Sequence, residues 1–120
     1  MNQRTSALCK AIIDGMADKK AKNIVQIDLT NVQGAVADVF IICHGDSSTQ
    51  TEAIGDGVEK STKEQLSDLP IHREGKAVGQ WVILDYFDVV VHIFHRDFRE
   101  VYNLEQYWGD GEIEEIKQAG

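Results

Sequence analysis

Two histidines and two aspartates have a spacing that could allow them to bind a metal ion. His92 and His95 are separated by two residues, and Asp85 and Asp88 follow the same spacing just upstream. Residues three apart on a strand point to opposite faces, so the two imidazoles cannot readily share one ion. Two carboxylates on a short loop are usually solvated turn residues rather than calcium or magnesium ligands. We therefore expect no metal site and no cofactor.

The segment around Gly45 offers two further kinds of chemistry. Residues 45–48 (Gly-Asp-Ser-Ser) stand where a strand gives way to a helix, and helix N-termini can hold phosphate. The segment lacks the glycine- and lysine-containing phosphate-binding pattern, and Asp46 would repel an anion, so a turn with a helix cap is favoured. Cys43 and His44 are adjacent on a predicted strand and point apart, which disfavours a thiolate–imidazole pair. No enzymatic activity is expected from these residues.

Apolar spacing predicts the elements that must position these residues. The predicted order α-β-β-α-β-β-β-α is an α/β fold of the mixed α+β kind, with a five-stranded sheet and about three helices. Helices are expected at about 6–18, with Thr5 or Ser6 as N-cap, at 47–66 and at 97–109. Strands are expected at 24–29, 39–44, 71–74, 81–84 and 89–94. Residues 1–109 are expected to form a single domain, and residues 110–120 an acidic, flexible tail.

The strands at 81–84 and 89–94 predict a hairpin with a four-residue loop. Symmetrical closure of that loop pairs Trp81 with His92 and gives the hairpin one aliphatic face, which packs on helices. The other face collects Trp81, His92 and Phe94. Two alternatives stay open for this second face. Either helices cover it as well, or it is a partner surface, because aromatic anchors ringed by charge are typical of interfaces.

Composition narrows the classes of partner. The 120 residues carry 12 Lys and Arg against 20 Asp and Glu, a net charge of −8. This balance argues against broad nucleic-acid binding and against an anionic membrane surface, and it fits a basic protein partner. No direct sequence-specific nucleic-acid partner is expected. No apolar run reaches the roughly 18 residues of a membrane span.

The two cysteines indicate the redox state of the cellular compartment. Cys9 and Cys43 could pair, but a single pair in a well-cored domain is no disulfide framework. We interpret them as buried thiols in a reducing compartment. The N-terminal residues also lack the apolar region of a secretory signal. The cytoplasm is the expected location.

Four stretches form more specific motifs: ADVFIICHGDSST at 37–49, HREG at 72–75, WVILDYFDVVVHIF at 81–94 and REVYNLEQYW at 99–108. Together, in one register over about residues 6–109, they resemble the ribosomal silencing factor family, also called the Iojap family. Two positions depart from the family pattern. Phe87 replaces the glycine of L-D-Y-G-D, so it carries strain if that position needs a positive φ, or the loop differs, or the ring adds an exposed apolar contact. Arg96 and Asp97 replace the usual proline, which leaves the third helix intact.

The resemblance implies a nucleotidyltransferase-like fold without that activity, because Asp85 and Asp88 are not the D-x-D pair of those enzymes. It implies a protein that binds the large ribosomal subunit through ribosomal protein fourteen (uL-fourteen). Bound there, it would block docking of the small subunit and repress translation under nutrient limitation. A role in large-subunit maturation is also implied.

The resemblance directs the partner site to the hairpin. Trp81 and Phe94 are expected as buried anchors with His92 beside them, and Asp85, Tyr86 and Asp88 as a polar rim. Arg73 and Glu74 are expected next to this surface. Two other classes stay open: a nucleotidyltransferase-like enzyme or nucleotide-binding protein, which would bind ATP with magnesium, and a module that self-associates into a homodimer, which light scattering would reveal.

Overall fold

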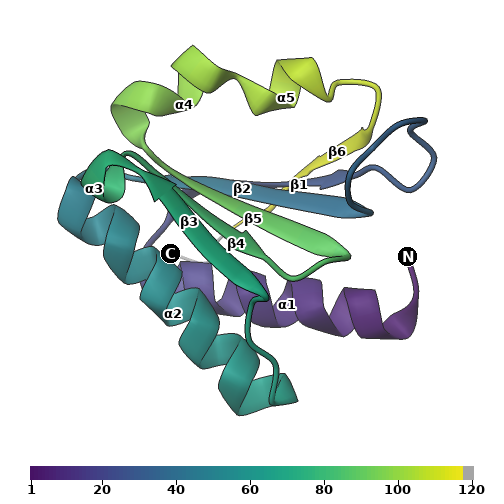
Figure 1. Cartoon of the computed structure of the whole chain (residues 1–120), viewed down its shortest axis with the longest axis horizontal. Coiled ribbons are helices and arrows are strands. Elements are labelled where there is room, and N and C mark those ends of the chain that lie inside the picture. The colour runs from purple at the N-terminus through teal and green to yellow at the C-terminus, as the bar shows by residue number, and fades with distance from the viewer. Residues whose placement is uncertain (118–120) are drawn as a thin grey trace.

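The computed structural model describes residues 1–117 as a mixed α/β fold, which confirms the predicted class. Its elements run as follows: α1 (Gln3–Asp18), β1 (Lys22–Asp28), β2 (Val39–Gly45), α2 (Ser48–Leu66), β3 (His72–Lys76), α3 (Ala77–Gln80), β4 (Trp81–Asp85), β5 (Val89–His95), α4 (Arg96–Tyr102), α5 (Leu104–Tyr107) and β6 (Glu112–Glu115). The strands form one sheet in the order β3-β4-β5-β2-β1-β6 (Figure 1). Within residues 1–117, no helix has the length and apolar composition of a membrane span.

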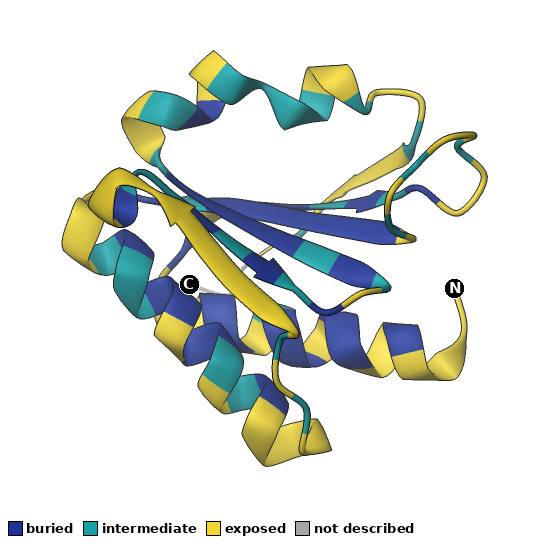
Figure 2. Cartoon of the chain, viewed as in Figure 1, coloured by how far each residue is buried: buried dark blue, intermediate teal, exposed yellow. Residues whose placement is uncertain are grey.

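Helices cover both faces of this sheet. Figure 1 shows α1 and α2 against one face, and α4 and α5 across the other. The strand β2 lies in the middle of the sheet, paired in parallel with β5 and antiparallel with β1. A strand buried on both faces needs an unbroken apolar run, and residues 39–43 are all buried (Figure 2). Two apolar cores result, one on each side of the sheet.

The helices α1 and α2 cross at glycines. A Cβ atom added to Gly15 would lie 2.7 Å from the carbonyl oxygen of Gly57. Glycine weakens a helix on its own, but here it allows two backbones to approach more closely than any side chain would permit. Gly57 therefore lowers the helix propensity of α2 but allows its close packing on α1.

Both helix starts are set by capping side chains. The side chain of Ser47 accepts a hydrogen bond from the Gln50 N–H at 3.0 Å, as expected for a cap at residues 45–48. The N-cap of α1 is Asn2, whose side chain accepts from the Thr5 N–H at 2.8 Å. The expectation of Thr5 or Ser6 as that N-cap was therefore wrong. The helix starts one turn earlier because asparagine is an equally good cap.

The C-terminal region differs from its prediction in two places. The helix expected at 97–109 is broken into α4 and α5, because Asn103 adopts the left-handed conformation (φ 46°) that ends helices. Residues 112–115 are not part of a tail but form β6 on the free edge of β1, so the sheet has six strands instead of five. All four residues of β6 are exposed, so no apolar pattern marks the strand. The end of the expected tail, residues 118–120, lies outside the described residues.

Candidate functional site

The hairpin formed by β4 and β5 closes more tightly than the sequence predicts. Trp81 pairs with Phe94, not with His92, and Asp85 pairs with Val90. The Tyr86 N–H donates to the Val89 carbonyl at 2.9 Å, which leaves a two-residue loop at 87–88. The predicted register was therefore off by two residues. A shift of two keeps every side chain on its predicted face, because side chains alternate with a period of two.

The tip of this hairpin holds Phe87 in a strained conformation. Phe87 has a φ of 74°, and the Asp88 N–H donates to the Tyr86 carbonyl at 3.0 Å, which defines a γ-turn. The Asp85 side chain stabilises the turn by accepting from the Phe87 N–H at 2.7 Å. The ring of Phe87 is 72% exposed. The two consequences expected for a missing glycine, strain and an exposed apolar ring, are thus both present.

The aromatic face of the hairpin is covered by α4 and α5. Phe94 is 0% and His92 6% exposed, and the Trp81 ring stacks on Phe94 with centroids 5.0 Å apart. Tyr102 of α4 closes over Trp81 with ring centroids 4.3 Å apart, and Trp108 meets the Phe40 ring edge-on at 5.7 Å in the same core. The expectation of an exposed face was wrong for His92 and Phe94. The alternative, that helices cover this face, is what the structure shows.

His92 is a neutral core residue in this arrangement. Trp81 Nε1–H donates to His92 Nδ1 at 3.2 Å, and the Phe40 ring meets the imidazole edge-on at 4.6 Å. Because burial disfavours the imidazolium, it lowers the pKa of His92 from 6.5 to about 3. The other nitrogen, Nε2, is buried and has no hydrogen-bond partner within residues 1–117. His92 therefore supports Trp81 from within the core.

Tyr86 lies on the opposite face of the hairpin, against α2. Its hydroxyl is 2.9 Å from Thr62 Oγ1, and burial raises its pKa to about 12. The side chain is 6% exposed, so its expected place in a polar rim was wrong. An even-numbered residue of β4 faces the aliphatic core, and Tyr86 continues that alternation past the strand end. It ties the hairpin tip to α2.

The charged residues expected near the hairpin are at the surface. Asp88 is half-buried and lies 3.9 Å from Arg4 of α1, and the fully exposed strand β3 carries Arg73 and Glu74. Arg73 points to α2, where its guanidinium pairs with Asp56 at 2.9 Å and with two glutamates. Arg73 therefore fixes β3 to α2, whereas Glu74 is exposed to solvent.

What the hairpin presents to solvent is its end. Ile71 is 62% exposed and donates its N–H to the Asp85 carbonyl at 2.7 Å, so it lies beside the tip. We call this region, formed by Ile71, Asp85, Phe87 and Asp88, the hairpin-end surface. Sequence reasoning missed Ile71, because it was taken as the first residue of the predicted strand at 71–74, where a β-branched residue is normally assigned to the core, whereas β3 begins at His72. Its neighbour Phe87 was found from its departure from the family motif.

Other chemistry considered from the sequence finds little support in the geometry. Cys9 and Cys43 are free and buried, which confirms them as thiols, and burial raises the pKa of each to about 12. Within residues 1–117, no three His, Cys, Asp or Glu side chains are placed to share a metal ion. The chain is thus a small mixed α/β domain whose hairpin end exposes apolar and acidic groups to solvent.

Comparison with known proteins identifies the family. The family model described as "Ribosomal silencing factor during starvation" matches residues 2–120. A protein of Halalkalibacterium halodurans named ribosomal silencing factor RsfS is 40% identical over 110 residues, which is 92% of each chain. The protein of that name from Bacillus subtilis is 38% identical and covers 97% of this chain and 95% of its own. The chain belongs to the ribosomal silencing factor family.

Solved structures agree with this assignment. A crystal structure of a Chromobacterium violaceum protein matches with a TM-score of 0.78 and 32% identity, over 91% of this chain and 88% of that one. A crystal structure from Bacillus halodurans matches with a TM-score of 0.75 and 34% identity, over 97% and 99%. The chloroplast protein Iojap of maize is 35% identical over 71 residues, so the Iojap resemblance seen in the motifs is also confirmed.

Proposed function

We propose that this protein binds the large ribosomal subunit through uL-fourteen, blocks docking of the small subunit, and so represses translation when nutrients are limited. It acts by steric exclusion in the cytoplasm, without catalysis. Family membership supports the ribosomal target. The main observation that supports the hairpin end as the binding site is the exposed Phe87 ring, which a positive-φ turn holds out from the hairpin between two carboxylates.

The hairpin-end surface has the composition that a basic ribosomal protein would complement. The ring of Phe87 and the side chain of Ile71 supply exposed apolar area in one place, and such clusters commonly mark a protein interaction site. Asp85 and Asp88 flank the ring with negative charge, in a chain whose net charge is −8. Acidic groups around an apolar anchor favour fast encounter with a basic partner and fix its orientation.

The remaining predicted site residues act in support of this surface. Trp81, His92 and Phe94 brace the hairpin from the α4–α5 side, and Tyr86 braces it from the α2 side. Arg73 holds β3 against α2, and Glu74 extends the acidic surface along the sheet edge. A hairpin packed on both faces presents its tip rigidly, which lowers the entropy cost of binding.

The test is co-sedimentation with separated large and small ribosomal subunits. The chain should sediment with the large subunit alone, and Phe87→Ser should weaken that binding at least about tenfold if the ring is an anchor. Tyr107→Ser is the matched control, since Tyr107 is a similarly exposed aromatic, at 77%, on α5. Equal losses for both variants would remove the hairpin end as the site, and no binding to the large subunit would reject the proposed function.

A subunit-joining assay then tests the steric mechanism. Addition of the chain to mixed subunits should reduce the fraction of joined ribosomes. Addition of the Phe87→Ser variant should leave this fraction close to its value without the protein. Binding to the large subunit without any effect on joining would keep the target and reject the steric block.

A further inference from the structure

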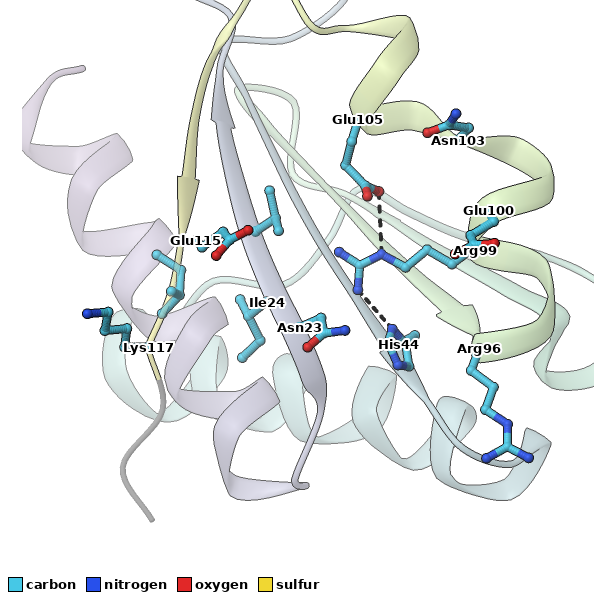
Figure 3. Close-up of a pocket in the computed structure, with 12 residues that line it drawn as sticks. Asn23, Ile24, His44, Arg96, Arg99, Glu100, Asn103, Glu105, Glu115 and Lys117 are labelled. Atoms are coloured by element: carbon cyan, nitrogen blue, oxygen red, sulfur yellow. Dashed lines mark hydrogen bonds and ion pairs between the residues drawn. The ribbon is translucent and has the colours of Figure 1, made fainter.

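A cavity of about 600 Å³ lies between β1, the end of β2, β6 and the α4–α5 layer (Figure 3). Its volume is typical of small-molecule sites, which measure roughly 300–1,000 Å³. Because β2 and β5 run in parallel, with Val39 beside Val89 and His44 beside Phe94, this cavity and the hairpin loop lie at opposite ends of the strands. The ribosome contact proposed above therefore leaves the cavity unused.

The wall on the α4 side is built around a buried arginine. The Arg99 side chain is only 9% exposed. Its Nε donates to Glu105 Oε1 at 3.4 Å, and its Nη1 donates to His44 Nδ1 at 2.8 Å and to the Lys22 carbonyl at 3.4 Å. The third nitrogen, Nη2, points into the cavity without a marked bond to the residues drawn there (Figure 3). A buried guanidinium with one donor directed into open space is suited to bind a carboxylate.

His44 holds this guanidinium in place. Arginine can only donate, so His44 Nδ1 must accept the bond and carry no proton. Burial and the charge of Arg99 both lower the pKa of His44, which keeps the imidazole neutral near pH 7. The donor that faces the cavity is therefore fixed in direction before any ligand arrives.

The opposite wall carries a carboxylate. Glu115 of β6 directs its side chain towards the same space as Arg99, and the Asn23 side chain lines the cavity beside His44 (Figure 3). Val25, whose side chain belongs to the core on the α4–α5 side of the sheet, completes this side. The cationic and anionic side chains of the lining balance, three against three: Arg96, Arg99 and Lys117, and Glu100, Glu105 and Glu115.

We propose that the cavity binds a small zwitterion of the α-amino-acid class, with its carboxylate on Arg99 and its ammonium on Glu115. A ligand that is only anionic would meet the carboxylates of the lining, and one that is only cationic would meet Arg99. A molecule that carries both charges satisfies both walls. Its side chain lies beside Val25 on the α4–α5 side of the sheet, which favours an aliphatic body.

The experiment is a binding titration on the full chain, followed by amide chemical shifts in NMR. The probes are L-leucine, isocaproate, which lacks the ammonium, and isopentylamine, which lacks the carboxylate. Leucine should shift the amides of residues that line the cavity, and each analogue should bind at least about tenfold more weakly. The other protein amino acids are then titrated to define the preferred side chain.

Variants test the two charged contacts separately. Glu115 lies on an exposed edge strand, and the Glu115→Gln variant should lose the preference for leucine over isocaproate. Glu114→Gln is the matched control, because Glu114 directly precedes Glu115 on β6, and this variant should keep that preference. Arg99→Gln should abolish binding of both leucine and isocaproate, provided that its circular dichroism and thermal transition show a folded chain.

Three results would overturn the assignment. They are the absence of any amino acid that binds more tightly than about 1 mM, isocaproate binding as tightly as leucine, or shifts that appear outside the cavity. Where Arg99→Gln does not fold, Glu115→Gln and the two analogues still decide the question. Because these readouts do not involve the ribosome, the outcome is independent of the function proposed above.

Discussion

Replacement of His92 by glutamine should change how the stability of this protein depends on pH. The imidazole is 6% exposed, and its pKa falls from 6.5 in the unfolded chain to about 3 in the fold, because burial penalises the charge. Between these two values the unfolded chain takes up a proton that the folded chain does not. The folded state therefore keeps its full stability above about pH 6.5 and loses it as the pH falls towards 3.

The size of this loss follows from the displacement of the pKa. Each pH unit within the window costs about 1.4 kcal/mol in the free energy of unfolding, so the native protein should lose about 2 kcal/mol between pH 6.5 and pH 5 through His92 alone. His44, whose pKa is also lowered, contributes a loss in the same direction. That contribution is present in both proteins and cancels in the comparison.

Urea unfolding followed by tryptophan fluorescence, at about pH 7.5 and about pH 5, measures the effect. Glutamine can still accept the hydrogen bond from Trp81 but does not titrate, so His92→Gln should be less stable at pH 7.5 yet lose about 2 kcal/mol less than the native chain on acidification. His72→Gln is the matched control, because His72 is exposed on β3. Identical pH dependence of the native chain and His92→Gln would refute the assignment of a buried, neutral His92.

Three further substitutions test the packing. Gly15→Ala should destabilise the fold by about 1–3 kcal/mol in urea unfolding, despite the better helix former, because its Cβ would lie 2.7 Å from the backbone of α2. Phe87→Gly should raise the free energy of unfolding by roughly 0.5–1 kcal/mol, because relief of the positive φ, worth about 1–2 kcal/mol, exceeds the entropy cost of glycine. The same variant should bind the large subunit more weakly. A lower free energy of unfolding would contradict the strained turn. Tyr86→Phe should lower the thermal midpoint, with a cost of about 1–2 kcal/mol for the lost contact with Thr62, and the exposed control Tyr107→Phe should leave it unchanged.

Much of the architecture could be predicted because the local signals were strong. Residues 39–43 of β2 are an unbroken apolar run, and α2 begins after a serine cap and ends at Leu66 as expected. The aliphatic and aromatic faces of the hairpin followed from simple alternation. They survived an error of two residues in the register, because such an error does not exchange the faces.

The candidate site was harder to predict. Trp81, His92 and Phe94 share a face as expected, but nothing local showed that α4 and α5 would fold back over it. That cover depends on the left-handed conformation of Asn103, which turns the chain between the two helices. The cavity around Arg99 was missed for the same reason, since it joins His44, Glu105 and the backbone of Lys22 from distant parts of the chain.

Residue patterns alone were enough to assign the family, the α/β class, the acidic charge and the position of the one unusual loop residue, Phe87. These properties depend on composition, periodicity and motifs, which are local. The folded chain was needed to show which aromatic residues are covered, that residues 112–115 complete the sheet, and which residue meets solvent at the hairpin tip. The physical reason is that exposure and strand pairing depend on contacts between segments far apart in the chain, and on backbone hydrogen bonds that carry no side-chain pattern.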